Sequence, residues 1–348
     1  MKIARVLSFD SGFMQGLLGA NFMNQFCQDA GIAVTDIYKY FDIITGVGGN
    51  ALQALFYAYG MTPDEVITFY KTNGPNIFTP LLTSNQKIAA NITETAFYTT
   101  NVLKTKLVEQ FGTDQMFQLK TNVIIPTVQF TDTSDTTGIN LETSYVPTLF
   151  SNMIAPDLTG QSYLISDVAM AASAIPSYFP AYGIIDPNDT DTTLYYRSGE
   201  LYTGNPATIA FASESILEGS TYDRLCVLSV GSGKGTIGFY EPTSIPPAAQ
   251  GDSYISLPTI NNVYYSTAMQ ANADSVDKTL EWLSLSGGRL DDSDLFYYRF
   301  QTTFDATNTE LDNSSDTFIK YMASAASNQY TIDKFKIAYF LQNAQLTN

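Results

Sequence analysis

The chain has 348 residues, enough for one large α/β domain or two ordinary ones, and its formal net charge is −17. A surface of this sign repels phosphate backbones, so we expect no nucleic-acid partner. The sequence contains no histidine, which excludes Ser-His-Asp and Cys-His catalysis and removes the commonest metal ligand. Cys27 and Cys226 lie far apart and suit buried apolar positions, so we expect no disulfide, metal or cofactor.

No segment approaches the roughly 18 uninterrupted apolar residues that a transmembrane helix requires. The residues before Ser8 lack the longer apolar run and the small-residue cleavage site of a secretory signal. We therefore expect a soluble protein of the cytoplasm or of an intracellular inclusion. No internal repeat or linker composition divides the sequence, so a single domain is expected over residues 1–348.

The first part of the chain alternates predicted strands with predicted helices. Ala4–Phe9 is predicted as a buried strand and about Gln15–Ala30 as a helix. Phe41–Thr45 is predicted as a second short strand. Ala51–Tyr59 is apolar nearly all round, as expected for a helix buried on every side. Thr62, followed by a proline and two acids, predicts the start of another helix.

The same alternation continues toward the C-terminus. Val123–Phe130 and Leu225–Val230 are predicted strands, and helical patterns cover about Ile260–Leu283 and Asp316 to the end. Asp186–Thr193 is rich in turn residues and is predicted as a surface loop. Alternating strands and helices predict an α/β fold with a largely parallel sheet covered on both faces.

A glycine-rich turn between the strand at 41–45 and the helix at 51–59 has the form of a nucleophile elbow. Such a turn holds a serine above the sheet, close to backbone N–H groups and a helix N-terminus. Gly46 and Gly49 stand at the small positions of the elbow, and Gly48 takes the place of the serine. A tight structural turn alone would also explain these glycines.

Further segments make the chain resemble the patatin-like phospholipase family, and most of all the plant patatins. The segments that carry this resemblance are Val6–Gly16, Tyr40–Gly46, Asn73–Phe78, Ala172–Pro180, Leu228–Gly233 and Tyr298–Gln301. The resemblance spans nearly the whole chain. It implies a three-layer α/β/α fold with a central, mostly parallel sheet, and lipid acyl hydrolysis through a Ser-Asp dyad.

Both dyad positions are changed in this sequence. Gly48 stands in place of the serine, and counting back from Asn205-Pro206 places Arg197 where the family has its aspartate. Arginine cannot act as a base at ordinary pH. A shift of one residue would place Ser198 there, which is no base either. We therefore predict that the catalytic site is inactive.

The loop that resembles the family's glycine-rich oxyanion loop is altered as well. Gly12 is retained, whereas Ser11 and Phe13 replace two glycines. Phe13 is bulky enough to close the space that a tetrahedral oxyanion would need. Ser11 is the alternative nucleophile, because it could approach the vacated site. The neighbouring Asp10 is expected to fix the loop by hydrogen bonds rather than to serve as a base.

Three functions stay open at this point. The first is a catalytically inactive storage or self-assembling structural protein, forming a homo-oligomer or ordered assembly. It is favoured by a charged fraction of only 15%, because uncharged polar side chains lose less rotamer entropy at a contact. The second is a scaffold that binds lipid or fatty acid in the family's apolar groove. The third is an acyl hydrolase with a relocated nucleophile.

Overall fold

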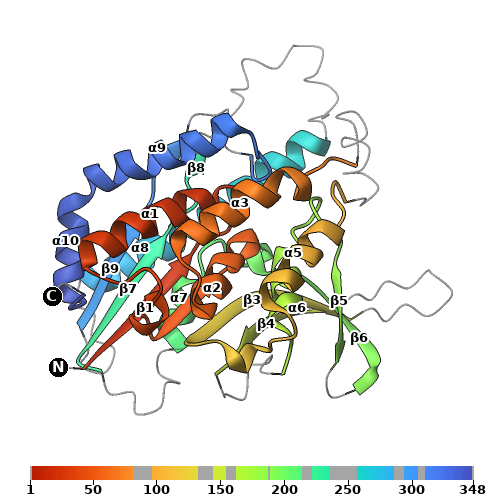
Figure 1. Ribbon diagram of the computed structural model, residues 1–348, viewed down its shortest axis with the longest axis horizontal. Helices are drawn as coiled ribbons and strands as arrows, with labels where there is room; N and C mark the ends of the chain where they lie inside the picture. The colour runs from red at the N-terminus through yellow and green to blue at the C-terminus, as the bar shows by residue number, and fades with distance from the viewer. Residues whose placement is uncertain are drawn as a thin grey trace, which may run out of the picture.

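The computed structural model describes residues 2–81, 96–131, 144–153, 162–186, 189–213, 222–235, 257–285, 294–304 and 310–346. Its centre is an eight-stranded sheet in the order β5-β6-β3-β2-β1-β7-β9, with β4 also paired to β3 (Figure 1). Its strands are β1 (Ile3–Phe9), β2 (Ile43–Gly46), β3 (Asn122–Thr131), β4 (Ser144–Ser151), β5 (Tyr182–Asp186), β6 (Asp189–Ser198), β7 (Arg224–Val230) and β9 (Asp294–Phe300). A separate two-stranded sheet pairs β8 (Lys234–Gly235) with β10 (Thr303–Phe304).

The parallel part of the sheet consists of β3, β2, β1, β7 and β9, and it confirms the predicted strands. In its register Phe9 lies beside Gly46 on one side and Val230 on the other. Because these strands run in one direction, their carboxyl ends meet at one edge of the sheet. Asp10 and the glycine turn that follows β2 are therefore brought together.

The other part of the sheet is antiparallel: β4 and β6 both pair with β3, and β5 pairs with β6. This arm corrects the predicted loop at Asp186–Thr193, because β6 already begins at Asp189. Thr193 pairs with Ile185, so cross-strand pairing decides the conformation of a segment whose composition is typical of a turn. Only residues 187 and 188 of that segment lie outside the described residues.

Helices cover both faces of the sheet, which confirms the three-layer α/β/α architecture (Figure 1). Successive residues of β1 point to opposite faces: Leu7 and Phe9 join one core, and Ala4 and Val6 the other. The helices of the larger core are α1 (Gly16–Ala30), α2 (Ala51–Tyr59), α3 (Pro63–Ile77), α5 (Asn101–Phe111), α6 (Ile165–Ser173), α9 (Asp316–Ile332) and α10 (Lys334–Asn343). The smaller core is closed by α7 (Ala207–Ser213) and α8 (Leu257–Leu285).

The local signals for two helices are visible in their ends. Thr62 caps α3 in a capping box with Glu65, as the Thr-Pro-acid pattern predicts. The helix predicted from Asp316 onward is two helices, since α9 ends at Ile332 and α10 begins at Lys334 around the buried Asp333.

Within the described residues, no helix combines the length and apolar character needed to span a bilayer.

Candidate functional site

The turn after β2 has the backbone of a nucleophile elbow. Gly48 adopts φ +61°, a left-handed conformation that favours glycine, and a short 3₁₀ helix over Gly48–Asn50 leads into α2. Gly46 is needed for close packing, because a Cβ there would lie 2.7 Å from the Asn50 carbonyl oxygen. The sequence prediction of a strand, a sharp turn and a buried helix is confirmed by these elements.

The space above Gly48 is already filled. A Cβ at Gly48 would lie 2.5 Å from the Ser11 Oγ and 2.6 Å from the Glu200 Oε2. A Cβ at Gly49 would overlap the Phe13 ring and the Gly12 carbonyl oxygen. Gly48 itself has no side chain, and the place where one would begin is taken by Ser11 and Glu200.

Ser11 brings its hydroxyl to this point from the loop after β1. The hydroxyl is hydrogen-bonded to the Glu200 carboxylate, which can only accept when it is ionised. The Ser11 backbone N–H donates to the Gly204 carbonyl at 3.0 Å, and its carbonyl accepts from the Ser232 hydroxyl at 2.5 Å. Because this N–H is engaged within the protein, it does not point at a substrate oxyanion.

Glu200 is the site residue that sequence reasoning missed. It lies in a 3₁₀ helix over Gly199–Leu201 and is 2% exposed. Gly199 before it is required, because a Cβ there would overlap the Pro126 backbone carbonyl. The Ser198 hydroxyl accepts from the Glu200 backbone N–H at 3.2 Å. The available signal was an acidic residue just after the Ser-Gly pair at 198–199.

Arg197, the position aligned with the dyad aspartate by counting, lies at the end of β6 opposite Val128. It is half-buried, and its Nη1 lies 3.5 Å from the Phe179 carbonyl oxygen. The three atoms nearest to a Cβ at Gly48 belong to Ser11 and Glu200 rather than to Arg197. The carboxylate beside the elbow is thus two residues beyond Ser198, and it comes from Glu200.

Phe13 packs into a cluster of aromatic rings beside the elbow. Its ring centroid lies 4.9 Å from that of Phe78 in an edge-to-face arrangement and 5.8 Å from that of Phe179. Phe78 also contacts Tyr98 at 5.2 Å between centroids. Phe13 is 1% exposed, so the loop after β1 delivers an apolar side chain to the core.

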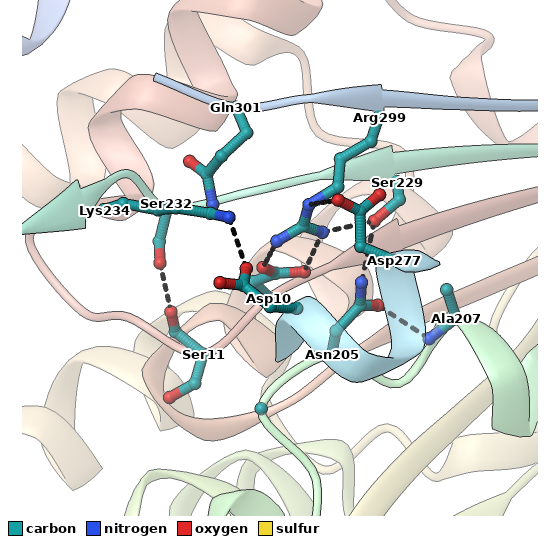
Figure 2. A network of polar contacts seen from close by, with 12 residues as sticks. Asp10, Ser11, Asn205, Ala207, Ser229, Ser232, Lys234, Asp277, Arg299 and Gln301 are labelled. Atoms are coloured by element: carbon teal, nitrogen blue, oxygen red, sulfur yellow. Dashed lines mark hydrogen bonds and ion pairs between the residues drawn. The ribbon is translucent and has the colours of Figure 1, made fainter. Parts of the chain in front are cut away.

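Asp10 holds the altered loop through a buried ion pair (Figure 2). Its two carboxylate oxygens accept from the Arg299 guanidinium at 3.0 and 2.5 Å, and Arg299 also donates to the Ser229 hydroxyl at 2.8 Å. Burial alone would lower the pKa of Arg299. The charges of Asp10 and Asp277 outweigh this effect, so the pKa lies above its ordinary value. Asp10 is therefore a scaffold residue, as the sequence analysis expected.

Comparison of the sequence with known protein families identifies the family of this chain. Residues 7–211, more than half of the chain, match the sequence model of the patatin-like phospholipases. The chain belongs to the patatin-like phospholipase family. The elbow, the altered oxyanion loop and the turn that carries Glu200 all lie inside the matched region.

Individual patatin-like relatives are distant. "Patatin-like protein 2" of Oryza sativa subsp. japonica is 26% identical over 261 residues, covering 67% of this chain and 62% of the relative. The matched region thus spans about three fifths of that relative's length. A "cGAMP-activated phospholipase" of Escherichia coli (strain TW11681) is 24% identical and covers 90% of this chain and 82% of the relative. Human GIVD cytosolic phospholipase A2 has a TM-score of 0.43 at 10% identity, covering 98% of this chain and 62% of that structure.

Among the described residues, His, Cys, Asp and Glu side chains form no group of three that could hold a metal ion. Burial raises the pKa of both thiols, Cys27 and Cys226, to about 12, which keeps them protonated and unreactive near neutral pH. Ser11 and Glu200 supply the polar atoms nearest to the place of a side chain at Gly48.

Proposed function

We propose that this patatin-like protein does not hydrolyse acyl esters and serves as a storage or self-assembling structural protein. The observation that carries the proposal is Gly48, which gives the elbow no nucleophile. In a nucleophile-base pair the two groups act as a unit, so loss of one already removes most of the rate enhancement. The Ser11–Glu200 pair occupies the space that a nucleophilic side chain at position 48 would need.

Two further features support an inactive site. The N–H of Ser11 donates to Gly204, and Phe13 lies against Gly49, so the altered loop is organised for packing rather than for binding an oxyanion. Charged residues make up 15% of the chain against roughly 25% in ordinary proteins, which favours contacts between copies. Assembly in the cytoplasm or in an intracellular inclusion is part of this proposal.

The experiment is hydrolysis of a short-chain chromogenic ester by the purified protein beside its Ser11→Ala variant. We expect both proteins to hydrolyse the ester no faster than buffer alone does. A rate that Ser11→Ala abolishes would overturn the proposal. A rate that survives in Ser11→Ala points to a contaminant or to another serine, which Glu200→Gln and a mock purification then separate.

A relocated acyl hydrolase is the second candidate, and the Ser11–Glu200 hydrogen bond is the observation that favours it. In this mechanism the Ser11 Oγ attacks the ester carbonyl while its proton passes to Glu200. The alcohol leaves with that proton, and water then hydrolyses the acyl-serine. The burial of both side chains and the engaged Ser11 N–H count against it.

A lipid-binding scaffold would use the family's apolar groove without chemistry. The aromatic rings around Phe13 give such a site an apolar lining, but Phe13 itself occupies part of that space. Titration with fatty acid, followed by tyrosine fluorescence, tests this function. Saturable binding would establish it, and a flat titration removes it.

A further inference from the structure

The helix α10 carries an exposed apolar surface at one end of the molecule. The buried side chains on its core side are Ile337, Phe340 and Leu341. Phe335 and Tyr339 lie four residues apart on the other side of the helix and are 91% and 61% exposed. Ile332, at the end of α9, is 73% exposed. Exposed apolar side chains that are grouped in this way mark a contact surface.

Basic side chains border this apolar surface. Lys334 and Lys336 lie on either side of Phe335 in the sequence, and both are exposed. The Lys336 side chain stays 73% exposed although its ammonium group lies 3.1 Å from the Asp333 carboxylate. We give the name basic face to the set Ile332, Lys334, Phe335, Lys336 and Tyr339.

Along α9 and α10, the lysines of the basic face meet no exposed acid. The only acidic residue from Thr317 to Leu346 is Asp333, which is buried. The acid before this range, Asp316, begins a helix of 17 residues and therefore lies about 24 Å from Ile332 along its axis. At physiological ionic strength charges are screened beyond about 8 Å, so Asp316 does not cancel the charge of the basic face.

Two acids approach α9 and α10 from neighbouring elements. Asp29 of α1 accepts a hydrogen bond from the hydroxyl of Tyr330 at 2.9 Å, and Tyr330 is buried on the core side of α9. Asp294 of β9 is exposed, and it lies two residues before Phe296, whose ring contacts that of Tyr339. Among the described residues, neither acid forms an ion pair with a lysine of the basic face. These lysines can therefore bind an anion from outside the chain.

The basic face lies far from the elbow. The end of α10 is fixed near the amino ends of two strands. Arg5 of β1 donates to the Ala344 carbonyl at 2.6 Å. Arg224 of β7 donates to the Asn343 carbonyl at 3.0 Å. The elbow follows the carboxyl end of β2, at the opposite edge of the sheet, and Figure 1 shows α10 at one end of the longest axis of the molecule. A partner of the basic face is therefore not delivered to the elbow.

We propose that the basic face docks on an anionic lipid surface. Its three apolar side chains enter the boundary between headgroups and acyl chains, and its two lysines contact the lipid phosphates. A short helix that presents aromatic and aliphatic side chains beside lysines is suited to this boundary. The lysine stems lie along the apolar layer while their ammonium groups stay at the level of the phosphates.

Charge decides between this occupant and a second copy of the chain. Two copies that met through the same face would bring lysines against lysines. The remaining surface of the protein is acidic overall, since the chain carries a net charge of −17, but screening limits its repulsion from the lipid to acids near the contact. The inference goes beyond the proposed function and does not depend on self-assembly.

Flotation of the purified protein with vesicles tests the inference. One set of vesicles is phosphatidylcholine alone, and the other is an equal mixture of phosphatidylcholine and phosphatidylserine. Phe335→Ser/Tyr339→Ser removes two apolar anchors, and Lys334→Gln/Lys336→Gln removes both charges. Because these side chains are exposed, the fold should be kept, which circular dichroism verifies.

Each of these variants has a control of matched composition outside the basic face. Phe117→Ser/Tyr145→Ser removes two other exposed aromatic rings. Lys39→Gln/Lys278→Gln removes two other exposed lysines and so changes the net charge equally.

We expect the wild type to bind the mixed vesicles at least about tenfold more tightly than phosphatidylcholine alone, and added salt to weaken this binding. Each face variant should bind the mixed vesicles at least about tenfold more weakly than the wild type. Both controls should bind as the wild type does.

Several results would overturn the inference. If the wild type does not float with the mixed vesicles, or floats equally with both kinds, an anionic surface is not its partner. If the face variants bind as tightly as the wild type, the lipid contact lies elsewhere on the chain, the elbow region included. If the protein self-associates without vesicles and Phe335→Ser/Tyr339→Ser abolishes this, the basic face is an interface between copies.

Discussion

The Ser11 hydroxyl and the Glu200 carboxylate are hydrogen-bonded at the point where a side chain on Gly48 would begin. Gly48, Ser11 and Glu200 are thereby linked in space. The serine and the glutamate fill the place that a side chain at Gly48 would occupy. The three residues should therefore be considered together in any attempt to restore the site.

Gly48→Ser alone should not restore hydrolysis and should lower the free energy of unfolding by about 1–3 kcal/mol, because its Cβ would collide with Ser11 and Glu200. Adding Ser11→Gly and Glu200→Ala should recover the part of that loss that comes from the collision, while the left-handed backbone at position 48 stays unfavourable for serine. Urea unfolding followed by circular dichroism measures both effects. If Gly48→Ser alone were as stable as the wild type, the space above Gly48 could not be filled by Ser11 and Glu200.

Restoring the dyad also tests where the base belongs. Arg197→Asp and Ser198→Asp are each added to the Gly48→Ser/Ser11→Gly/Glu200→Ala variant, and their rates of ester hydrolysis are compared. We expect Ser198→Asp to give the larger gain, because Gly199 after it packs on the Pro126 carbonyl as a tight Asp-Gly turn requires. A gain only with Arg197→Asp would favour the count from Asn205-Pro206 instead.

Ser11→Ala should lower the free energy of unfolding by about 1–3 kcal/mol, since it leaves the buried Glu200 carboxylate without its hydroxyl donor. Ser324→Ala, at an exposed position on α9, should change it by less than about 0.5 kcal/mol. Glu200→Gln keeps a hydrogen-bonding group and should be milder than Glu200→Ala. Equal effects for Ser11→Ala and Ser324→Ala would show that the pair does not stabilise the loop.

Arg299→Met should be among the most destabilising single changes, with a loss of about 3–5 kcal/mol, because it leaves the buried Asp10 carboxylate without its guanidinium partner. Asp10→Asn added to Arg299→Met should recover part of that loss. Thermal and urea unfolding of the two singles and the double give the coupling energy. Additive losses would contradict the ion pair as the element that holds the loop.

Alkaline pH should destabilise the fold. Burial raises the pKa of Cys27 and Cys226 to about 12, and burial also raises the pKa of Tyr57 and Tyr70. In the unfolded chain these groups ionise at their ordinary, lower pKa values, so above about pH 9 the unfolded state holds fewer protons than the folded state. Stability therefore falls as pH rises from about 9 to 12.

Urea midpoints measured across that range test this expectation, and tyrosinate absorbance reports when the buried rings ionise. Ionisation should coincide with unfolding rather than precede it. A midpoint that stays constant from pH 8 to 12, roughly the range that the thiol and tyrosine pKa values span, would contradict it.

The sequence predicted the parallel half of the fold better than the antiparallel half. Ala4–Phe9 and Leu225–Val230 are continuous apolar runs, and such runs identify strands buried on both faces. The start of β6 is polar, and its composition is that of a turn. Pairing with β5 makes it a strand, and only its end, from Tyr195 to Ser198, also pairs with the distant β3.

At the site, the sequence located Gly48, Ser11 and Phe13 because the family's glycine pattern fixes their neighbours. Glu200 could not be found in this way, since its role depends on how the turn after β6 meets the loop after β1. Counting from Asn205-Pro206 identified the region but not the carboxylate that faces the elbow. Only the three-dimensional structure shows that Glu200 and Ser11 are partners.

The absence of an active nucleophile is tested most directly by labelling the native protein with a serine-reactive phosphonate and measuring its intact mass. We predict no adduct on the wild type, and an adduct on the rebuilt Gly48→Ser, Ser198→Asp, Ser11→Gly, Glu200→Ala variant. An adduct on the wild type that maps to Ser11 and disappears in Ser11→Ala would contradict the account. Ser11 and Glu200 would then be the working dyad of an acyl hydrolase.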